Sequence, residues 1–212
     1  MNKKSIFIYI AASIAILVPV PGRFVYGLTM VLELILLMSV GTSVQFLIKK
    51  TGYERINTVM TLFILLCVTI LFRNFIAALQ SEIALTLGFC FYLPAFSSFM
   101  IGFMFSENDL PPVKKLLANL LTTLKFSVFA LFFFLVRDVV GFGTFTFYGK
   151  NHTIFEYVIF AEDSTTPFSF LASLPGGLFL SAIILFCLIL VRKRFYIIHR
   201  FTSNSKKGEA EK

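Results

Sequence analysis

The sequence has few charged residues and little of the side-chain chemistry that most enzymes use. Only 14% of its 212 residues are Asp, Glu, Lys or Arg, and it contains three cysteines, two histidines and no tryptophan. His152 and His199 are isolated from each other along the chain. No phosphate-binding loop, nucleophile elbow or zinc motif occurs. The sequence therefore gives no indication of a catalytic or metal site within this chain.

Apolar residues are abundant instead. They make up 58% of the chain, and the mean hydropathy is +0.87, which is more apolar surface than a soluble domain of this size needs. Six apolar segments can be read, at about 5–20, 24–48, 56–79, 83–105, 116–136 and 168–191. All but the first are long enough to cross a bilayer core, which takes about 20 helical residues. We predict an all-α membrane protein with six transmembrane helices in one domain (1–201) and a disordered cytoplasmic tail (202–212).

Lysine and arginine are distributed unevenly between the two sides of this predicted domain. If the N-terminus is inside, the outer loops hold only Arg23, Arg137 and Lys150, and 14 of the 19 basic residues lie in the inner segments. The positive-inside rule then puts both termini in the cytoplasm. The net charge of +8 follows from this topology. Because the basic residues flank spans and do not form one groove, no nucleic-acid partner is expected.

The six segments divide into two groups of three. The first and fourth segments are interrupted by proline, at Pro19 and Pro21 in one and at Pro94 in the other. Three spans per group would place the two halves in opposite orientations, and paired broken helices in inverted halves indicate a central site. The alternative is that these prolines are tolerated without a functional role.

Two charges fall near the middle of predicted spans. Glu33 is the tenth residue of the second span and Lys125 the tenth of the fifth, so each lies about 14 Å from its entry surface. An isolated charge at that depth is costly and needs a partner or water. We hypothesise that Glu33 and Lys125 approach each other or line a common polar cavity, either as a structural ion pair or as part of an ion path.

The stretch from Arg137 to Phe179 carries the most specific pattern in the chain. It combines a charged pair at a membrane edge, a glycine turn, an acidic loop and a helix entered through proline and glycine. The residues are Arg137, Asp138, Gly141, Gly143, Thr144, Pro175 and Gly176. We interpret Arg137 and Asp138 as an ion pair at the end of the fifth span that fixes the loop.

This stretch resembles the last third of the Rnf/Nqr membrane subunits of the RnfE/NqrD type. There, an Arg-Glu pair precedes a Gly-x-Gly-Thr turn, and a Leu-Pro-Pro-Gly-Ala-Phe segment opens the last helix. The resemblance implies two inverted three-helix halves and a non-catalytic subunit of a redox-driven ion pump in the bacterial cytoplasmic (inner) membrane. Such complexes move electrons between ferredoxin or NADH and NAD or quinone. The implied partners are an opposite-topology homologue and flavin-bearing subunits.

In that family each half supplies one cysteine to a 2Fe–2S cluster shared by two subunits. The positions that correspond to these cysteines are Ser13 and Ser98. Because a serine hydroxyl is a poor cluster ligand, we expect no conventional iron ligation by this chain, with flavins and any cluster held elsewhere in the complex. Cys67, Cys90 and Cys187 have no ligand-like spacing and are expected to be buried structural thiols.

A second function remains open on the same residues. Substrate-binding membrane components of vitamin or small-solute transporters are also basic, similar in size and often six-spanning. The absence of the cluster cysteines makes this alternative more serious. The sequence does not identify an ion, an electron donor or an acceptor.

Overall fold

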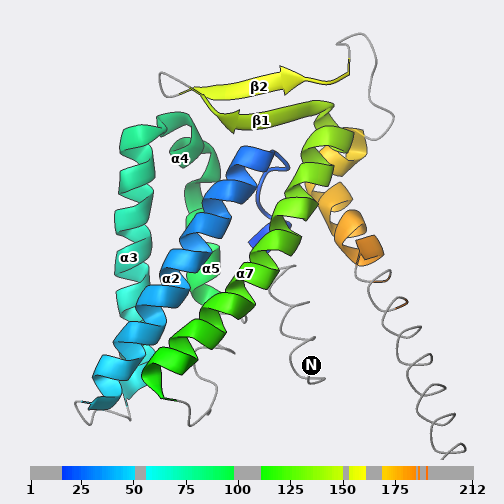
Figure 1. Cartoon of the computed structure of the whole chain (residues 1–212). Coiled ribbons are helices and arrows are strands. Elements are labelled where there is room, and N and C mark those ends of the chain that lie inside the picture. Colours follow the sequence, from blue (N-terminus) through cyan, green and yellow to red (C-terminus); the bar gives the residue numbers. More distant parts are fainter. Residues whose placement is uncertain are drawn as a thin grey trace, which may run out of the picture.

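Three helices form the framework of the computed structural model, which describes residues 16–50, 56–97, 111–149, 153–160, 169–184, 186 and 190. They are α2 (Phe24–Lys50), α3 (Asn57–Leu79) and α7 (Pro112–Val136), and the last continues as the π-helical η3 (Arg137–Phe142) (Figure 1). All three are long and apolar enough to span a membrane. They match the predicted second, third and fifth spans, whereas the six-span count extends beyond the described residues.

The outer and inner faces of these helices have the polarity of a membrane protein. The buried residues of α3 include Asn57, Thr61 and Thr69, whereas Phe63 and Leu71 are more than two-thirds exposed. On the buried face, the Thr61 hydroxyl donates to the carbonyl of Asn57 at 2.7 Å. Lipid is as apolar as leucine, so membrane helices pack through small and polar residues and turn large apolar ones outward.

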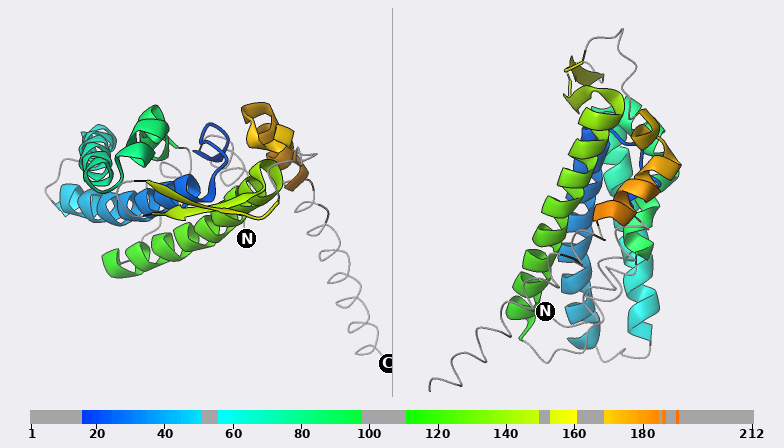
Figure 2. Two further views of the ribbon diagram at one scale, coloured as in Figure 1. Left: turned by 90° about the horizontal axis from the view of Figure 1, so that it is seen from above. Right: turned by 90° about the vertical axis from the view of Figure 1, so that its right-hand side faces the viewer.

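The α2 helix is central and runs antiparallel to α7 along its length. Figure 2 shows the two helices side by side from two further directions, with α3 next to α2 in Figure 1. Near one end of the pair, Nδ2 of Asn119 donates to Oγ1 of Thr42 at 3.2 Å. Near the other end, the Phe134 ring packs directly on the backbone of Gly27, and a Cβ at Gly27 would overlap that ring. The glycine therefore allows the two helices to approach closely.

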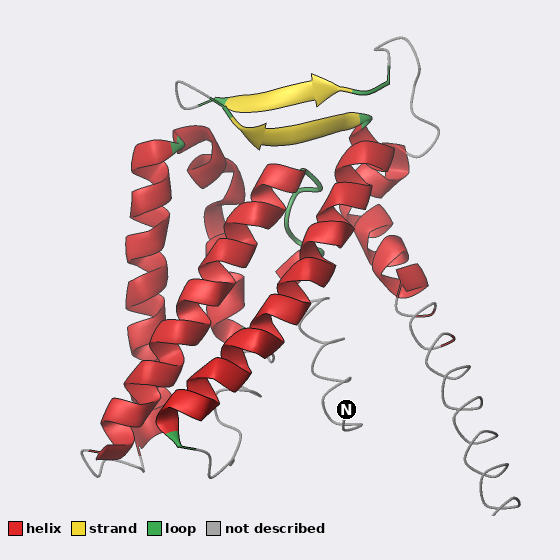
Figure 3. Cartoon of the chain, in the orientation of Figure 1, coloured by secondary structure: helices red, strands yellow, loops and turns green. Residues whose placement is uncertain are grey.

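The described residues are mostly helical, as predicted, but the long loop after α7 adds a β-hairpin that the sequence analysis did not predict. Strand β1 (Thr144–Tyr148) pairs antiparallel with β2 (Ile154–Val158), and Thr146 lies opposite Glu156 (Figure 3). The cause is local, because threonine and aromatic residues alternate in β1, and both types favour strands. The hairpin lies across the end of the bundle where α2 begins (Figure 1).

The predicted fourth span is interrupted, but at Gly88 and not at Pro94. Helix α4 (Ser81–Leu87) ends at Gly88, whose φ of 44° is in the range that favours glycine. A 3₁₀ segment, η2 (Gly88–Tyr92), follows, and Pro94 lies in the first turn of α5 (Leu93–Phe96). Proline is tolerated in a first turn because the N–H that it lacks would have no partner inside the helix.

The predicted sixth span begins with a short interrupted segment. The 3₁₀ turn η4 (Ser169–Ala172) precedes a helix at Leu174–Ile184. The predicted first span is described only at residues 16–20, where a helical turn ends at Leu17. Its last residues, Ile16 to Val18 and Val20, are buried in the core. The end of the first segment and the start of the sixth both lie beside η3, where Arg137 binds carbonyl groups of each.

The close approach of α2 and α7 gives a testable prediction. Gly27→Ala should lower the free energy of unfolding by about 1–3 kcal/mol, because the new methyl group overlaps the Phe134 ring. Thermal unfolding in detergent measures this change. Adding Phe134→Ala should recover part of the loss, so the double variant is more stable than the sum of the single changes predicts. Leu121→Ala on the exposed face of α7 is the control and should have little effect. Additive losses would contradict the proposed contact.

Candidate functional site

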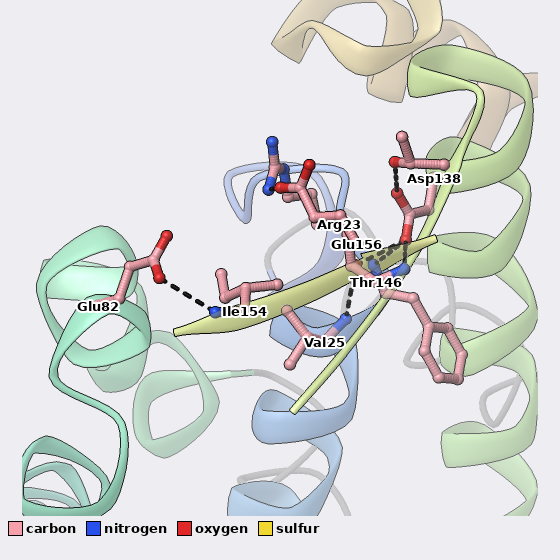
Figure 4. A network of polar contacts seen from close by, with 9 residues as sticks. Arg23, Val25, Glu82, Asp138, Thr146, Ile154 and Glu156 are labelled. Atoms are coloured by element: carbon pink, nitrogen blue, oxygen red, sulfur yellow. Dashed lines mark hydrogen bonds and ion pairs between the residues drawn. The ribbon is translucent and has the colours of Figure 1, made fainter. Parts of the chain in front are cut away.

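The Asp138 carboxylate joins the hairpin to the start of α2. Asp138 is fully buried, and its Oδ2 accepts hydrogen bonds from the backbone N–H of Phe24 at 3.0 Å and of Thr146 at 2.8 Å. The Thr146 hydroxyl also donates to Oδ2, at 2.7 Å, and the Thr144 hydroxyl donates to Oδ1, at 3.0 Å. The Thr146 hydroxyl in turn accepts the N–H of Val25 at 3.4 Å (Figure 4).

These contacts cap α2 from another part of the chain. The first N–H groups of a helix have no partner within it and carry a partial positive charge, which a carboxylate complements. The first turn of α2 contains no acidic residue of its own. Asp138 supplies the missing acceptor from 114 residues away, directly to Phe24 and through Thr146 to Val25.

The Arg137 guanidinium joins the end of the first segment to the start of the sixth segment. It is 1% exposed, and all five of its N–H donors reach backbone carbonyls. Nη1 donates to Val20 at 2.9 Å and Leu17 at 3.4 Å. The remaining three bonds go to the other segment, from Nε to Leu171 at 3.3 Å and from Nη2 to Ala172 at 3.1 Å and Ser173 at 3.4 Å. The guanidinium also lies over the Phe133 ring.

Arg137 and Asp138 therefore do not form the predicted ion pair. Adjacent residues on a helix point in different directions and cannot face each other. Arg137 points toward the end of the first segment and the start of the sixth. Asp138 points toward the hairpin and α2. Each charge is satisfied mainly by backbone groups of the opposite polarity.

Glycines allow the backbone to pack closely around Arg137 and the segment that it binds. A Cβ at Gly22 would lie 2.9 Å from Nε of Arg137, and one at Gly177 would lie 3.1 Å from its Cζ. A Cβ at Gly141 would lie 2.8 Å from the backbone nitrogen of Ala172. Gly143 has φ of 71°, in the left-handed region, and starts the turn into Thr144.

The last two residues of the sequence pattern, Pro175 and Gly176, also lie near Arg137. Gly176 packs on the backbone of Phe170 and Leu171, where a Cβ would overlap the chain. Pro175 lies in the first turn of the Leu174–Ile184 helix. Among the motif residues predicted from sequence, the structure thus brings Pro175 and Gly176 next to the carbonyls that bind Arg137.

Glu33 is a buried carboxylate without a hydrogen-bond partner. It is 0% exposed on α2, and neither carboxylate oxygen makes a hydrogen bond of normal geometry. The Thr69 hydroxyl of α3 is close enough to interact with it, yet that hydroxyl also lacks a hydrogen bond. Buried polar groups are almost always bonded, so an unbonded carboxylate and hydroxyl indicate a place for water, a proton or an ion.

Lys125 is not the partner of Glu33, so the predicted pair is wrong. Lys125 is exposed on α7, whereas Glu33 is completely buried, and no ion pair joins them in the described part of the chain. The place of a residue in the sequence of a span gives its depth in the membrane. Rotation about the helix axis, which amounts to about 100° per residue, decides which way each side chain points.

The cysteines are placed differently from expectation. Cys67 is exposed on α3, so it is not a buried thiol. Cys90 is half-buried, and its Sγ lies 3.7 Å from the carbonyl of Pro19, which brings the fourth segment against the end of the first. Ser13, Ser98 and Cys187 lie outside the described residues. Within those residues, no group of three His, Cys, Asp or Glu side chains is placed to hold a metal ion.

Sequence reasoning missed the polar contacts that hold the hairpin. Arg23 forms an ion pair with Glu156, and Glu82 of α4 accepts the N–H of Ile154 at 3.2 Å (Figure 4). Nε2 of Gln80 donates to the carbonyl of Gly149 at 2.9 Å. The alternation of threonine and phenylalanine at 144–147 was the available signal for the strand, but no sequence pattern identified these partners.

Comparison with known protein families and with characterised proteins finds no match to this chain.

The Asp138 network gives a testable prediction. Asp138→Ala should cost about 3–5 kcal/mol of unfolding free energy, because it leaves buried N–H and hydroxyl donors without acceptors. Asp138→Asn should cost much less, because the amide oxygen can still accept and the amide nitrogen can donate to Thr144. Thermal unfolding and hydrogen exchange at the amides of Phe24 and Thr146 report the change.

Glu156→Gln is the matched control for this experiment. It removes a carboxylate from the same hairpin, but from a partly exposed ion pair that contributes about 0–1 kcal/mol. Equal losses for Asp138→Ala and Glu156→Gln, with unchanged exchange at Phe24, would show that the cap does not hold α2.

Proposed function

We propose that this chain is a non-catalytic membrane subunit of an Rnf/Nqr-like ion-translocating electron-transport complex, and that its own side chains ligate no iron–sulfur cluster. The proposal rests on one observation. The stretch Arg137–Thr144 packs against the start of the sixth segment, which leads into Leu174–Phe179. These are the two stretches in which the sequence resembles the RnfE/NqrD type. They pack together through Arg137 and Gly141 on one side and Ala172 and Gly177 on the other, so the resemblance lies in one physical unit.

The interrupted segments support the proposal in a second way. The first segment ends at Leu17, and the fourth is interrupted at Gly88. They touch where Cys90 lies against Pro19. Contact between two interrupted segments, one from each proposed half, supports an architecture of two inverted three-helix halves, in which broken helices meet at a central site. The proposed full architecture has six spans, with both termini in the cytoplasm of a bacterium.

Glu33 is the proposed contribution of this chain to ion movement. Ionisable residues inside membrane spans are costly and usually mark an ion or proton path. Glu33 meets this description because it is buried in a long apolar helix and neither carboxylate oxygen is bonded. Electrons would be carried by flavins or clusters on partner subunits, including an opposite-topology homologue.

The first test of the proposal is a purification of the tagged chain from its native membrane in mild detergent, with mass spectrometry of the proteins retained. An opposite-topology homologue and flavin-bearing subunits are expected. Recovery of an ATPase pair with a membrane coupling protein would instead favour the solute-transporter alternative. Stoichiometric iron and labile sulfide bound by this subunit alone would contradict the absence of cluster ligation.

A second test concerns Glu33 in the assembled complex. Glu33→Gln keeps the size of the side chain but removes its charge, so the complex should assemble while ion transport falls at least about tenfold. Ion uptake by reconstituted vesicles and complex yield are measured together. Glu82→Gln is the control, since Glu82 is an exposed carboxylate at the hairpin end of the bundle. Normal transport by the Glu33→Gln complex would exclude Glu33 from the path.

A further inference from the structure

A groove lies between the end of α2 and the start of α7. These two helix ends are at the opposite end of the bundle from the hairpin (Figure 1). Its volume is about 330 Å³. The residues that line it include Thr42, Ser43, Phe46 and Leu47 of α2 and Val113 and Leu116 of α7. Phe46 and Leu47 are about half exposed and Val113 is 76% exposed, so the groove opens on the outer surface of the helix pair.

The hydroxyl groups in this groove are already bonded within the protein. Thr42 Oγ1 donates to the Met38 carbonyl at 2.8 Å and accepts from Asn119. Ser43 Oγ donates to the Ser39 carbonyl at 2.9 Å. A ligand in the groove therefore meets apolar side chains and hydroxyls whose protons are engaged. Such a surface fits a hydrocarbon chain better than a polar metabolite.

The end of the groove is positively charged. Lys50 is exposed and lies on the same face of α2 as Ser43 and Leu47, because residues three, four and seven apart share a helix face. Lys114 is exposed in the first turn of α7, which contains no acidic residue. Lys115 is directed inward, where its Nζ donates to Oε1 of Gln45 at 3.3 Å. Lys50 thus stands at the end of an apolar channel, whereas Lys114, one residue from Val113 and two from Leu116, does not share their face of α7.

We propose that this groove binds an anionic phospholipid, with one acyl chain between α2 and α7 and the phosphate at Lys50. An apolar channel that ends in a cation is complementary to an amphipathic anion. Basic residues at the ends of spans attract anionic lipids, with about 1 kcal/mol per Lys near the surface. This inference is independent of the proposed electron-transport function, because it needs only the helix pair and a bilayer.

Native mass spectrometry of the full chain, released from nanodiscs of phosphatidylglycerol and phosphatidylcholine in equal amounts, tests the proposal. We expect the retained lipid to be mainly phosphatidylglycerol. Lys50→Gln should lower that preference by about fivefold. Ser43→Phe, which fills the groove, should reduce retention of the lipid while Lys50 remains.

Lys125→Gln is the matched control, because it removes an exposed lysine from α7 away from the groove. Equal retention of the two lipids by the wild-type chain would overturn the proposal. So would an equal loss of preference in Lys125→Gln, which would indicate a general charge effect. Displacement of the lipid by inorganic phosphate alone would also overturn it, since the site would then recognise the anion without the acyl chain.

Discussion

The structure depends on two adjacent buried charges that are each neutralised by backbone groups. Arg137 binds carbonyls at the end of the first segment and the start of the sixth, where short helical turns end and leave acceptors with partial negative charge. Asp138 binds the N–H groups at the start of α2, where the partial charge is positive. Each charge thus gains partners that the helix ends would otherwise lack, which offsets the cost of burial. Removal of either charge would leave helix ends unsatisfied in several elements.

A second constraint is the polarity of the helix surfaces. In water, a helix buries its apolar face and exposes polar residues, but α3 and α7 bury asparagine, threonine and serine together with apolar residues, and they expose further leucine and phenylalanine residues. Close contacts such as Gly27 on Phe134 then hold the helices together through packing. Glu33 and the neighbouring Thr69 depart from this pattern, because both are buried without the local hydrogen bonds that satisfy Thr42 and Thr61.

Segment length and hydropathy predicted the long helices α2, α3 and α7 to within a few residues, because a bilayer dictates both properties. The facing directions could not be predicted in the same way, since lipid-facing and protein-facing positions are both largely apolar. Glu33 and Lys125 therefore share a depth without sharing a contact. The roles of Arg137 and Asp138 also required the structure, because their partners are backbone atoms that any sequence supplies. The hairpin was readable in the alternation at 144–147, but the stretch was interpreted only as an acidic loop.

The two-sided coordination of Arg137 has a consequence for how the protein is made. When α7 leaves the ribosome, Leu17 and Val20 already exist, but Leu171 to Ser173 have not yet been synthesised. At about 5–20 residues per second, those carbonyls follow Arg137 after a delay of seconds. During that interval the guanidinium has only part of its final shell. The sixth segment therefore supplies the last hydrogen-bond acceptors to a guanidinium that the earlier helices have already positioned. Folding around Arg137 is complete only when both segments are bound to this one side chain.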